Sequence, residues 1–259
     1  MTEYRDQMNR IIRLESSPCR IISLVPSQTQ LLHHIGLERE VVGITKFCIQ
    51  PEEWFKSKTR IGGTKAVDIE KVRAMKPDLI IGNKEENSAG DIEQLSLIAP
   101  VWMSDISTLD DALEMIHSLG KIVNKPTSDL IAAIQNAFSE LSISKERKAI
   151  EGKSVLYFIW KEPDMLAGKD TFIDDLLTRI GLLNATNVAR YPLLPTDVKA
   201  DHIFLSSEPY PFVEKHLSLF QDAFPNAKIT LVDGEMFSWY GSKLVDAPAY
   251  FIKLLKAIG

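Results

Sequence analysis

Hydrophobic and polar positions alternate along the chain between two patterns. Short apolar runs, typical of buried strands in a parallel sheet, are separated by segments whose apolar residues recur every three or four positions, as in amphipathic helices. In the first half of the chain, the apolar runs predict strands at residues 20–25, 41–45, 79–81 and 101–103. Strands that alternate with helices indicate parallel pairing, with the helices covering the sheet.

The intervals between these strands have helical periodicity. Residues 29–35 form one predicted helix, for which Ser27 is the expected N-cap. Residues 68–75 form a shorter helix, which ends before Pro77 because proline disfavours helical geometry in the residue that precedes it. A further helix is expected after Ser107, which can cap it. The first part of the chain therefore predicts an α/β fold.

A long helix is expected in the middle of the chain, at residues 128–147, where four apolar residues at helical spacing form one stripe. At about 1.5 Å per residue, about twenty residues span roughly 30 Å, the diameter of a small domain. This helix is therefore the candidate connector between two parts of the protein. Beyond it the alternation restarts, with strands predicted at residues 153–160, 203–205 and 229–232 and a closing helix at residues 242–258.

Two segments before the long helix have counterparts after it. Residues 31–37 (LLHHIGL) match residues 176–182 (LLTRIGL), at an offset of 145. Residues 76–80 (KPDLI) match residues 199–203 (KADHI), at an offset of 123. The first pattern is a helix end with a glycine suited to a left-handed C-cap, and the second is a helix end that enters a strand. Two matches in the same order indicate two similar lobes.

The two offsets differ because the second lobe is shorter. Gly36 and Asp78 are 42 residues apart, whereas their counterparts Gly181 and Asp201 are 20 apart, so the second lobe lacks about 22 residues. We expect two Rossmann-like α/β lobes with parallel sheets, joined by one long backbone helix. The expected divisions are residues 1–125 for the N-terminal lobe, 126–150 for the connecting helix and 151–259 for the shortened C-terminal lobe.

Composition and charge narrow the class of protein. Of the 259 residues, 45% are hydrophobic and 25% charged, which is ordinary for a globular protein and excludes a disordered or collagen-like chain. The net charge of -5 argues against a nucleic-acid partner. No apolar run approaches the roughly 18 residues of a membrane-spanning helix. Charges scattered through the first twenty residues leave no room for a signal-peptide core, which favours a cytoplasmic location or a missing export signal.

Candidate binding residues follow the predicted strands, because ligands of open α/β sheets lie at the carboxyl ends of their strands. Aromatic walls with a few polar groups suit a planar or apolar ligand, whereas the alternative is that these rings seal the core. In the first lobe the candidates are Ser27, Gln28, Phe47, Cys48 and Lys84. In the second lobe they are Trp160 and the aromatic residues Phe237, Trp239 and Tyr240 of the segment 233–240.

Signatures of enzymes and metal sites are weak. The chain has no dinucleotide-binding, phosphate-binding or nucleophile-elbow glycine motif. Its histidines are isolated or adjacent, and no paired Cys-x-x-Cys motif occurs, so we expect no structural metal site. Cys48 is either a small buried hydrophobe or a contact to a soft metal or corrinoid cobalt. A disulfide with Cys19 is not expected, since parallel neighbours would hold the two cysteines at opposite ends of the sheet.

The order and spacing of three segments resemble a known family. Residues 20–37 (RIISLVPSQTQLLHHIGL), 41–45 (VVGIT) and 60–82 (RIGGTKAVDIEKVRAMKPDLIIG) are similar to the first lobe of class III periplasmic binding proteins. These helical-backbone receptors deliver cobalamin, haem or iron-siderophores to ABC importers. The cobalamin-binding branch is the most similar.

This resemblance implies a non-enzymatic receptor that holds a metal-chelate ligand (a corrinoid, haem or ferric siderophore) in a cleft between the lobes, with no other cofactor. It places the cleft at Phe47, Thr64, Trp160 and the 237–240 loop, and assigns Glu70 to docking on the importer. It further implies an ABC transporter permease as partner, a periplasmic location and a monomer.

Two other hypotheses stay open at this point. One is a cytoplasmic metal- or corrinoid-handling protein or enzyme that uses the Cys48 thiolate, which would need a lowered thiol pKa. The other is an interaction module whose aromatic loop packs on another chain.

Overall fold

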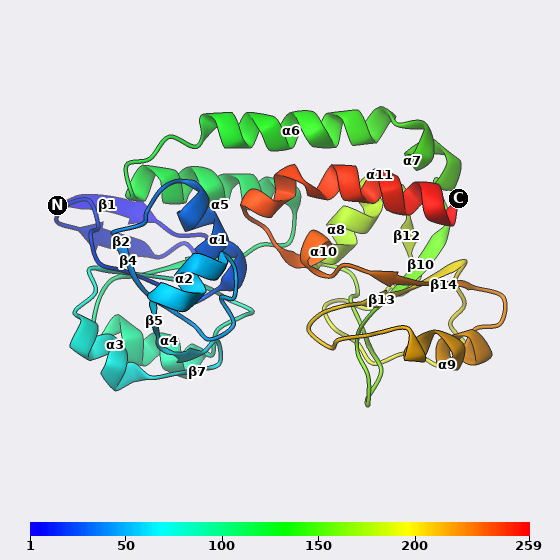
Figure 1. Cartoon of the computed structure of the whole chain (residues 1–259), viewed down its shortest axis with the longest axis horizontal. Helices are drawn as coiled ribbons and strands as arrows, with labels where there is room; N and C mark the ends of the chain where they lie inside the picture. The colour runs from blue at the N-terminus through cyan, green and yellow to red at the C-terminus, as the bar shows by residue number, and fades with distance from the viewer. The chain divides into compact units, whose positions relative to one another are not determined.

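The computed structural model describes all 259 residues, and the chain divides into two compact units (Figure 1). Unit 1 comprises Met1–Asp105, Asp110–Ile131 and Tyr240–Lys243, and unit 2 comprises Ile106–Leu109, Ala132–Trp239 and Leu244–Gly259. Most of the predicted N-terminal lobe falls in unit 1 and most of the predicted C-terminal lobe in unit 2. The expected connecting segment is shared between them, and a short segment near the C-terminus returns to unit 1.

Unit 1 is built on a five-stranded sheet whose strands all run parallel, in the order β5-β4-β3-β8-β9. The central strand pairs on both sides: Ile21 lies opposite Val41 on one side and Leu79 on the other. All residues of β3 and β8 are buried, as the continuous apolar runs predict. The strands are β3 (Ile21–Ser23), β4 (Val41–Ile44), β5 (Thr59–Arg60), β8 (Leu79–Asn83) and β9 (Val101–Ser104).

The helices of unit 1 begin where the sequence offers a suitable first turn. Asp68 accepts the backbone N–H of Lys71 and so caps α3. The prediction of Ser27 as an N-cap is wrong: α1 begins at Pro26, because proline fits a first turn in which its missing N–H has no partner to lose. The helices are α1 (Pro26–His34), α2 (Glu52–Ser57), α3 (Ile69–Met75), α4 (Ala89–Ser96) and α5 (Leu109–Ile122).

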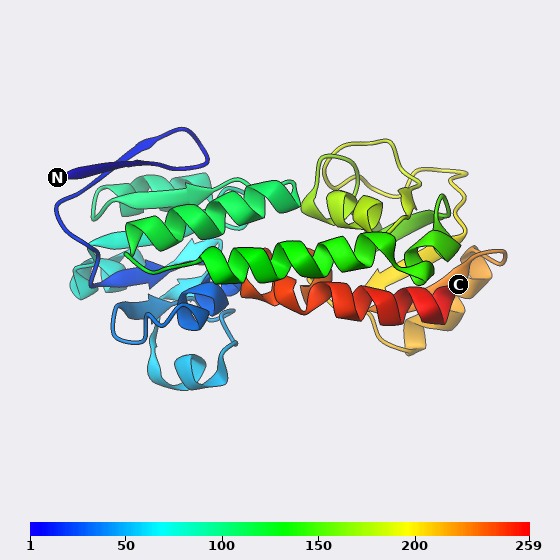
Figure 2. The ribbon, with the colours of Figure 1, turned by 90° about the horizontal axis from the view of Figure 1, so that it is seen from above.

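Two antiparallel hairpins of unit 1 escaped the sequence analysis. The first, β1 (Thr2–Arg5) and β2 (Ile11–Leu14), forms the dark blue ribbon at the N-terminus (Figure 2). The second, β6 (Gly62–Gly63) and β7 (Ala66–Val67), contains the glycine pair. Their strands have four and two residues, too short for the period of the pattern to stand out.

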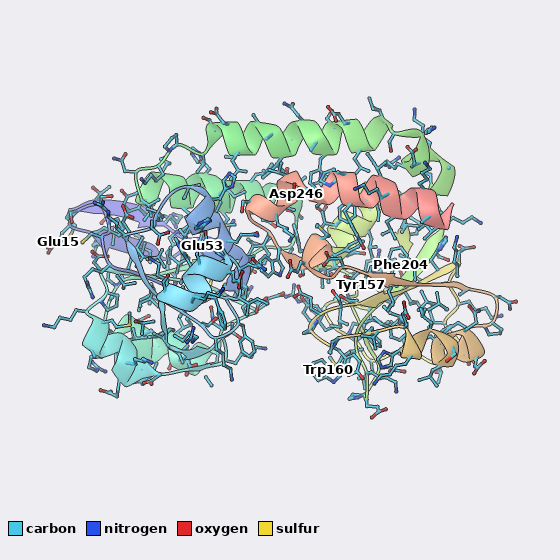
Figure 3. All side chains as sticks on the ribbon, viewed as in Figure 1. Glu15, Glu53, Tyr157, Trp160, Phe204 and Asp246 are labelled. Atoms are coloured by element: carbon cyan, nitrogen blue, oxygen red, sulfur yellow. The ribbon has the colours of Figure 1, made fainter.

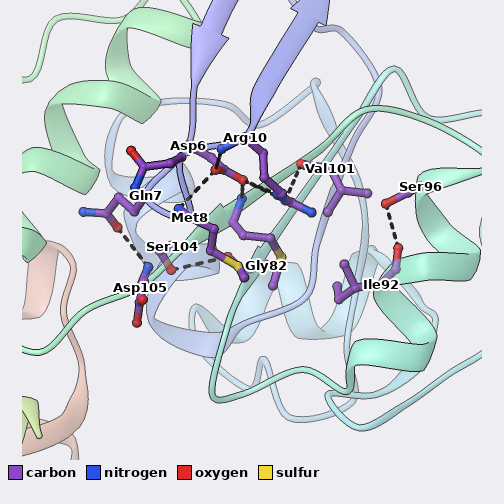
Figure 4. A network of polar contacts seen from close by, with 12 residues as sticks. Asp6, Gln7, Met8, Arg10, Gly82, Ile92, Ser96, Val101, Ser104 and Asp105 are labelled. Atoms are coloured by element: carbon purple, nitrogen blue, oxygen red, sulfur yellow. Dashed lines mark hydrogen bonds and ion pairs between the residues drawn. The ribbon is translucent and has the colours of Figure 1, made fainter.

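The N-terminal hairpin is fastened to the edge strand β9 by a polar network (Figure 4). Asp6 is buried and pairs with Arg10 at 2.7 Å, and Arg10 also donates to the carbonyl oxygen of Val101 at 2.9 Å. The backbone N–H of Gln7 donates to the carbonyl oxygen of Met103 at 3.1 Å. The hairpin therefore protects an edge that would otherwise expose unpaired backbone groups.

Unit 2 repeats this plan with fewer elements. Three strands run parallel, β10 (Ser154–Trp160), β13 (His202–Ser206) and β14 (Lys228–Val232). Two short strands complete the sheet beside β10, the antiparallel β11 (Met165–Leu166) and the parallel β12 (Leu183–Asn184). Its helices are α7 (Lys145–Ile150), α8 (Phe172–Arg179), α9 (Lys215–Ala223), α10 (Glu235–Ser238) and α11 (Ala247–Ile258).

The two predicted long helices are both interrupted, which corrects the sequence analysis. The central segment forms α6 (Ser128–Ile143) and then α7, because the Ser144 hydroxyl accepts the backbone N–H of Arg147 and starts a new helix. The closing segment forms a 3₁₀ turn, η1 (Ser242–Val245), and then α11. Pro248 lies in the first turn of α11, where a proline is tolerated, whereas in a continuous helix it would remove a hydrogen bond.

Matching contacts confirm the internal repeat. Gly36 and Gly181 both have positive φ angles, 80° and 91°, and each ends a helix as the shared pattern predicts. The carboxylate of Asp78 accepts the backbone N–H of Arg20 at 2.9 Å, where β3 begins. Asp201 accepts the backbone N–H of Ser154 at 2.8 Å, where β10 begins. The strands β3 and β10, and likewise β8 and β13, are therefore equivalent.

Candidate functional site

The carboxyl edge of the unit 1 sheet is held by buried polar side chains. Gln28, at the start of α1, donates from Nε2 to the Ser104 hydroxyl at 2.7 Å, and Asn83 Nδ2 donates to the same oxygen at 2.9 Å. Because these residues follow or end three different strands, the network fixes the loops beyond them. Gln28 is fully buried and Ser27 nearly so, hence neither is displayed at the surface of this unit.

Cys48 belongs to a second buried group at this edge. Its sulfur lies 3.1 Å from the hydroxyl oxygens of both Thr29 and Thr45, and its side chain has no exposed surface. Burial raises the pKa of the Cys48 thiol, although the two hydroxyls oppose the shift. A reactive or metal-binding thiolate needs the opposite shift. The structure therefore favours the core role, and Cys48 and Cys19 are both free thiols.

Phe47 presents an open aromatic surface at the end of β4. Its side chain is 51% exposed, and the Lys46 ammonium lies 5.1 Å from the ring centroid. The ring packs beside Gly63, where a Cβ atom would stand only 3.3 Å from the ring. Phe47 therefore lies next to the β6–β7 hairpin, whose turn contains Thr64.

Thr64 is held in place by Asn87, which donates from Nδ2 to the Thr64 carbonyl oxygen at 2.9 Å. Asn87 was not among the predicted residues, and its position after a strand was the only signal that could have found it. Lys84, the last candidate at this edge, pairs with Asp105 at 2.6 Å and is half-exposed. The carboxyl edge of the unit 1 sheet thus presents one exposed aromatic ring, a threonine and a lysine whose charge is paired with an aspartate.

In unit 2 the carboxyl edge also carries an open ring (Figure 3). Trp160, the last residue of β10, is 41% exposed. Tyr210 meets it edge-on, with ring centroids 5.7 Å apart. Tyr210 follows β13, so the rule that placed Trp160 at a strand end could also have identified it.

Glu208 is a residue that the sequence analysis missed. It follows β13, and its carboxylate accepts the Trp239 indole N–H at 3.1 Å and the Ser238 hydroxyl. Burial raises the pKa of Glu208, and the nearby Glu235 adds to the shift. A Cβ atom at Gly234 would lie 2.5 Å from Glu208 Cγ, so the turn can approach only because that residue is glycine. Through its hydrogen bonds to Ser238 and Trp239, Glu208 holds the segment after β14 in position.

The predicted aromatic loop is mostly structural. Residues 235–238 form the short helix α10 rather than a loop. Phe237 is fully buried and packs against Tyr157 and Phe251, with centroid distances of 5.1 and 4.7 Å. Trp239 and Tyr240 are also buried. Phe237 is therefore a core residue, which is the alternative to ligand contact that the sequence analysis left open.

Glu70 lies in the first turn of α3, with its side chain 83% exposed and an ion pair of 3.5 Å to Arg73. Such a carboxylate is accessible to a partner. No group of three or more His, Cys, Asp or Glu side chains is arranged to hold a metal ion. None of the helices combines the length and the apolar character needed to span a bilayer.

Comparison with solved structures identifies the class of fold. The crystal structure of Helicobacter pylori CeuE with Ni(II) bound matches 97% of this chain and 88% of its own, with a TM-score of 0.82 and 13% identity. The match confirms the expected architecture of class III periplasmic binding proteins, with two α/β lobes.

Sequence comparison then identifies the family. An uncharacterized ABC transporter substrate-binding lipoprotein, YvrC of Bacillus subtilis, is 29% identical over 192 residues, which cover 70% of this chain and 59% of the relative. A vitamin B12-binding protein of Pectobacterium atrosepticum is 26% identical over 181 residues, 68% of this chain and 64% of the relative. The alignments thus span less than two thirds of either relative. The family model described as periplasmic binding protein matches residues 21–194, and the chain belongs to this family.

Proposed function

We propose that the chain is the substrate-binding protein of an ABC importer and that its ligand is a corrinoid. One structural observation carries the proposal: in each unit the carboxyl edge of the parallel sheet ends in an exposed aromatic ring, Phe47 in unit 1 and Trp160 in unit 2. Family membership and the names of the two relatives support it. Haem and a ferric siderophore are the competing ligands of the same class.

Exposed rings supply the main binding energy in this proposal. If the ligand covers about 100 Å² of each ring, the gain is about 2.5 kcal/mol per ring at roughly 25 cal/mol per Å². Polar groups at the carboxyl edge of the unit 1 sheet, the Thr64 hydroxyl and the Lys84–Asp105 pair, can bond the amide side chains of a corrinoid. The loss of ligand and side-chain freedom offsets part of the gain.

The Cys48 thiol, the one nucleophile that the sequence analysis considered, is not suited to covalent catalysis. Cys48 is buried and its pKa is raised, and the family is one of substrate-binding proteins. We therefore propose binding without chemical conversion of the ligand.

Delivery to a transporter completes the proposal. The carboxylate of Glu70 is exposed on α3, and we assign it to docking on an ABC permease. The description of the family as periplasmic binding proteins supports a location outside the cytoplasm, which we propose for this chain. We propose that it acts as a monomer.

Titration with cyanocobalamin tests the ligand. We expect saturable binding that quenches tryptophan fluorescence, and a loss of affinity of about tenfold, equal to about 1.4 kcal/mol, for Phe47→Ala and for Trp160→Ala. Leu97→Ala is the matched control, because Leu97 is 75% exposed at the end of α4 and lies outside the proposed site. Cys48→Ala should retain binding if the thiol has only a packing role.

Two outcomes would contradict this assignment. Tighter binding of haem or of a ferric siderophore than of cyanocobalamin would assign a different ligand but leave the proposed receptor function in place. Failure of all three compounds to bind, with circular dichroism unchanged, would overturn the function.

A further inference from the structure

Unit 2 lacks the counterpart of one helix of unit 1. The repeat makes Asp78 equivalent to Asp201, and in unit 1 the helix α3 precedes Asp78 directly. In unit 2, residues 185–200 before Asp201 form turns, bends and two isolated β-bridges but no helix. The omission of about 22 residues thus removes α3 but keeps the helix that follows the next strand, α4 in unit 1 and α9 in unit 2.

In unit 1, α3 covers apolar surface. Val72 is fully buried, and Met75 reaches β4, since a Cβ atom at Gly43 would lie 2.9 Å from Met75 Cε. Ile69 and Met75 are partly buried on the same side. The inner stripe of α3 therefore consists of apolar residues at positions i, i+3 and i+6.

In unit 2 a groove of about 780 Å³ lies beside α9. One wall is the coil of residues 194–200, and the other is α9 with the turn after it. The walls are mainly apolar, and they include Leu194, Val198, Phe220 and Phe224, which belong to or pack on the core cluster of this unit. Leu219, on α9, is 51% exposed within this lining.

Charged side chains of both signs also line the groove: Lys161, Asp164, Asp197 and Lys199. They complement a ligand whose apolar stripe is flanked by charges of both signs. The helix α3 has this composition, with Glu70, Lys71 and Arg73 outside its apolar stripe.

We propose that this groove is a docking site for an amphipathic helix of about two turns that belongs to a partner protein. The helix presents apolar residues at i, i+3 and i+6 and takes the place that α3 fills in unit 1. The inference stands apart from the proposed ligand, because no residue of the groove belongs to the ligand site.

A peptide that copies the missing helix tests the groove directly. The probe is a fluorescent, side-chain-stapled peptide with the sequence of residues 68–76 (DIEKVRAMK), linked through positions 70 and 74, which are exposed in the protein. We expect its fluorescence anisotropy to rise and saturate with the full chain. A peptide with Val72→Asp should not bind, since it loses the centre of the apolar stripe.

Matched protein variants locate the binding. Leu219→Arg should weaken peptide binding at least about tenfold, whereas Leu97→Arg, at the C-terminal end of the equivalent helix α4 of unit 1, should leave it unchanged. Both positions are exposed, so both variants should fold, which circular dichroism verifies. Cyanocobalamin binding should be equal in the two variants, which separates this inference from the proposed function.

Three results would overturn the inference. The first would be no change in the fluorescence anisotropy of the peptide when the protein is added. The second would be an equal loss of peptide binding in the two arginine variants. Alternatively, light scattering shows a dimer that Leu219→Arg dissociates, which assigns the groove to a second copy of this chain.

Discussion

Phe47 and Phe237 show how one sequence signal leads to two different roles. Both are aromatic residues that follow a strand, and both were predicted to contact a ligand. In the structure Phe47 is open to solvent beside Gly63, whereas Phe237 lies among the rings of the unit 2 core. The difference arises because α10 turns Phe237 back onto the sheet, a direction that depends on Glu208 and Gly234 rather than on the aromatic residue itself.

Glu208 gives a prediction about pH. Burial raises its pKa above the ordinary value of 4.5, so between these two pKa values the folded protein holds a proton that the unfolded chain releases. Stability from this residue is fully present below pH 4.5 and is lost as the pH rises through the raised pKa. The substitution Glu208→Gln keeps an oxygen acceptor for Trp239 and should remove that loss. The melting temperature of the variant should therefore rise relative to that of the wild type as the pH increases.

Thermal melts at a series of pH values from about 4 to 8 measure this gain. Glu93→Gln is the control, because Glu93 is an exposed carboxylate on α4. If the melting temperatures of the wild type and of Glu208→Gln change equally with pH, the Glu208 carboxylate does not contribute to the pH dependence of stability.

At the scale of elements, the two interrupted helices show the limit of periodicity. Apolar spacing continues across Ser144, so the pattern predicts one helix where the structure has α6 and α7. A cap is a local hydrogen bond, and it ends a helix without altering the spacing of the apolar residues around it. The helix α6 therefore ends at Ile143, earlier than the apolar spacing predicts.

We expect Ser144→Ala to destabilise unit 2. The substitution removes the acceptor of the Arg147 N–H, a bond of 3.2 Å, and the loss of an N-cap costs about 1 kcal/mol. The melting temperature should fall by about 2–4 °C. Ser139→Ala, at an exposed position within α6, should cause no such fall, and an equal effect of both changes would contradict the capping role.

For the whole molecule, the repeat is the strongest feature that the sequence revealed. The two short matches were enough to predict equivalent lobes, and the structure shows the same aspartate contact in both. Glycines at helix ends act through local backbone geometry, so they leave a mark in the sequence, whereas the two aspartates bond strands 58 and 47 residues away.

Hydrogen exchange can test whether the two aspartates act alike. Asp78→Ala should speed exchange of the Arg20 amide at the start of β3, and Asp201→Ala should speed exchange of the Ser154 amide at the start of β10. Because each bond lies within one unit, each change should leave the other strand unaffected. A change in both strands from either substitution would mean that the aspartates act globally.

The pH dependence of the Asp201 contact has the opposite sign to that of Glu208. The backbone hydrogen bond from Ser154 lowers the pKa of Asp201 below its ordinary value of 3.8. Its contribution is present above that value and is lost as the pH falls through the lowered pKa. The protection of the Ser154 amide should therefore decline only in acid.

From the sequence alone we could predict the main parallel strands, their alternation with helices, the repeat, the shortening of the second lobe and the likeness to periplasmic binding proteins. The first four follow from periodicity and backbone geometry, which short segments encode, and the likeness is a resemblance carried by the order and spacing of residues 20–37, 41–45 and 60–82. The tertiary structure alone decided which candidate side chains are exposed: it buried Gln28, Cys48 and Phe237 and left Phe47 and Trp160 open. Exposure depends on what packs over a residue from distant parts of the chain, and no local pattern records it.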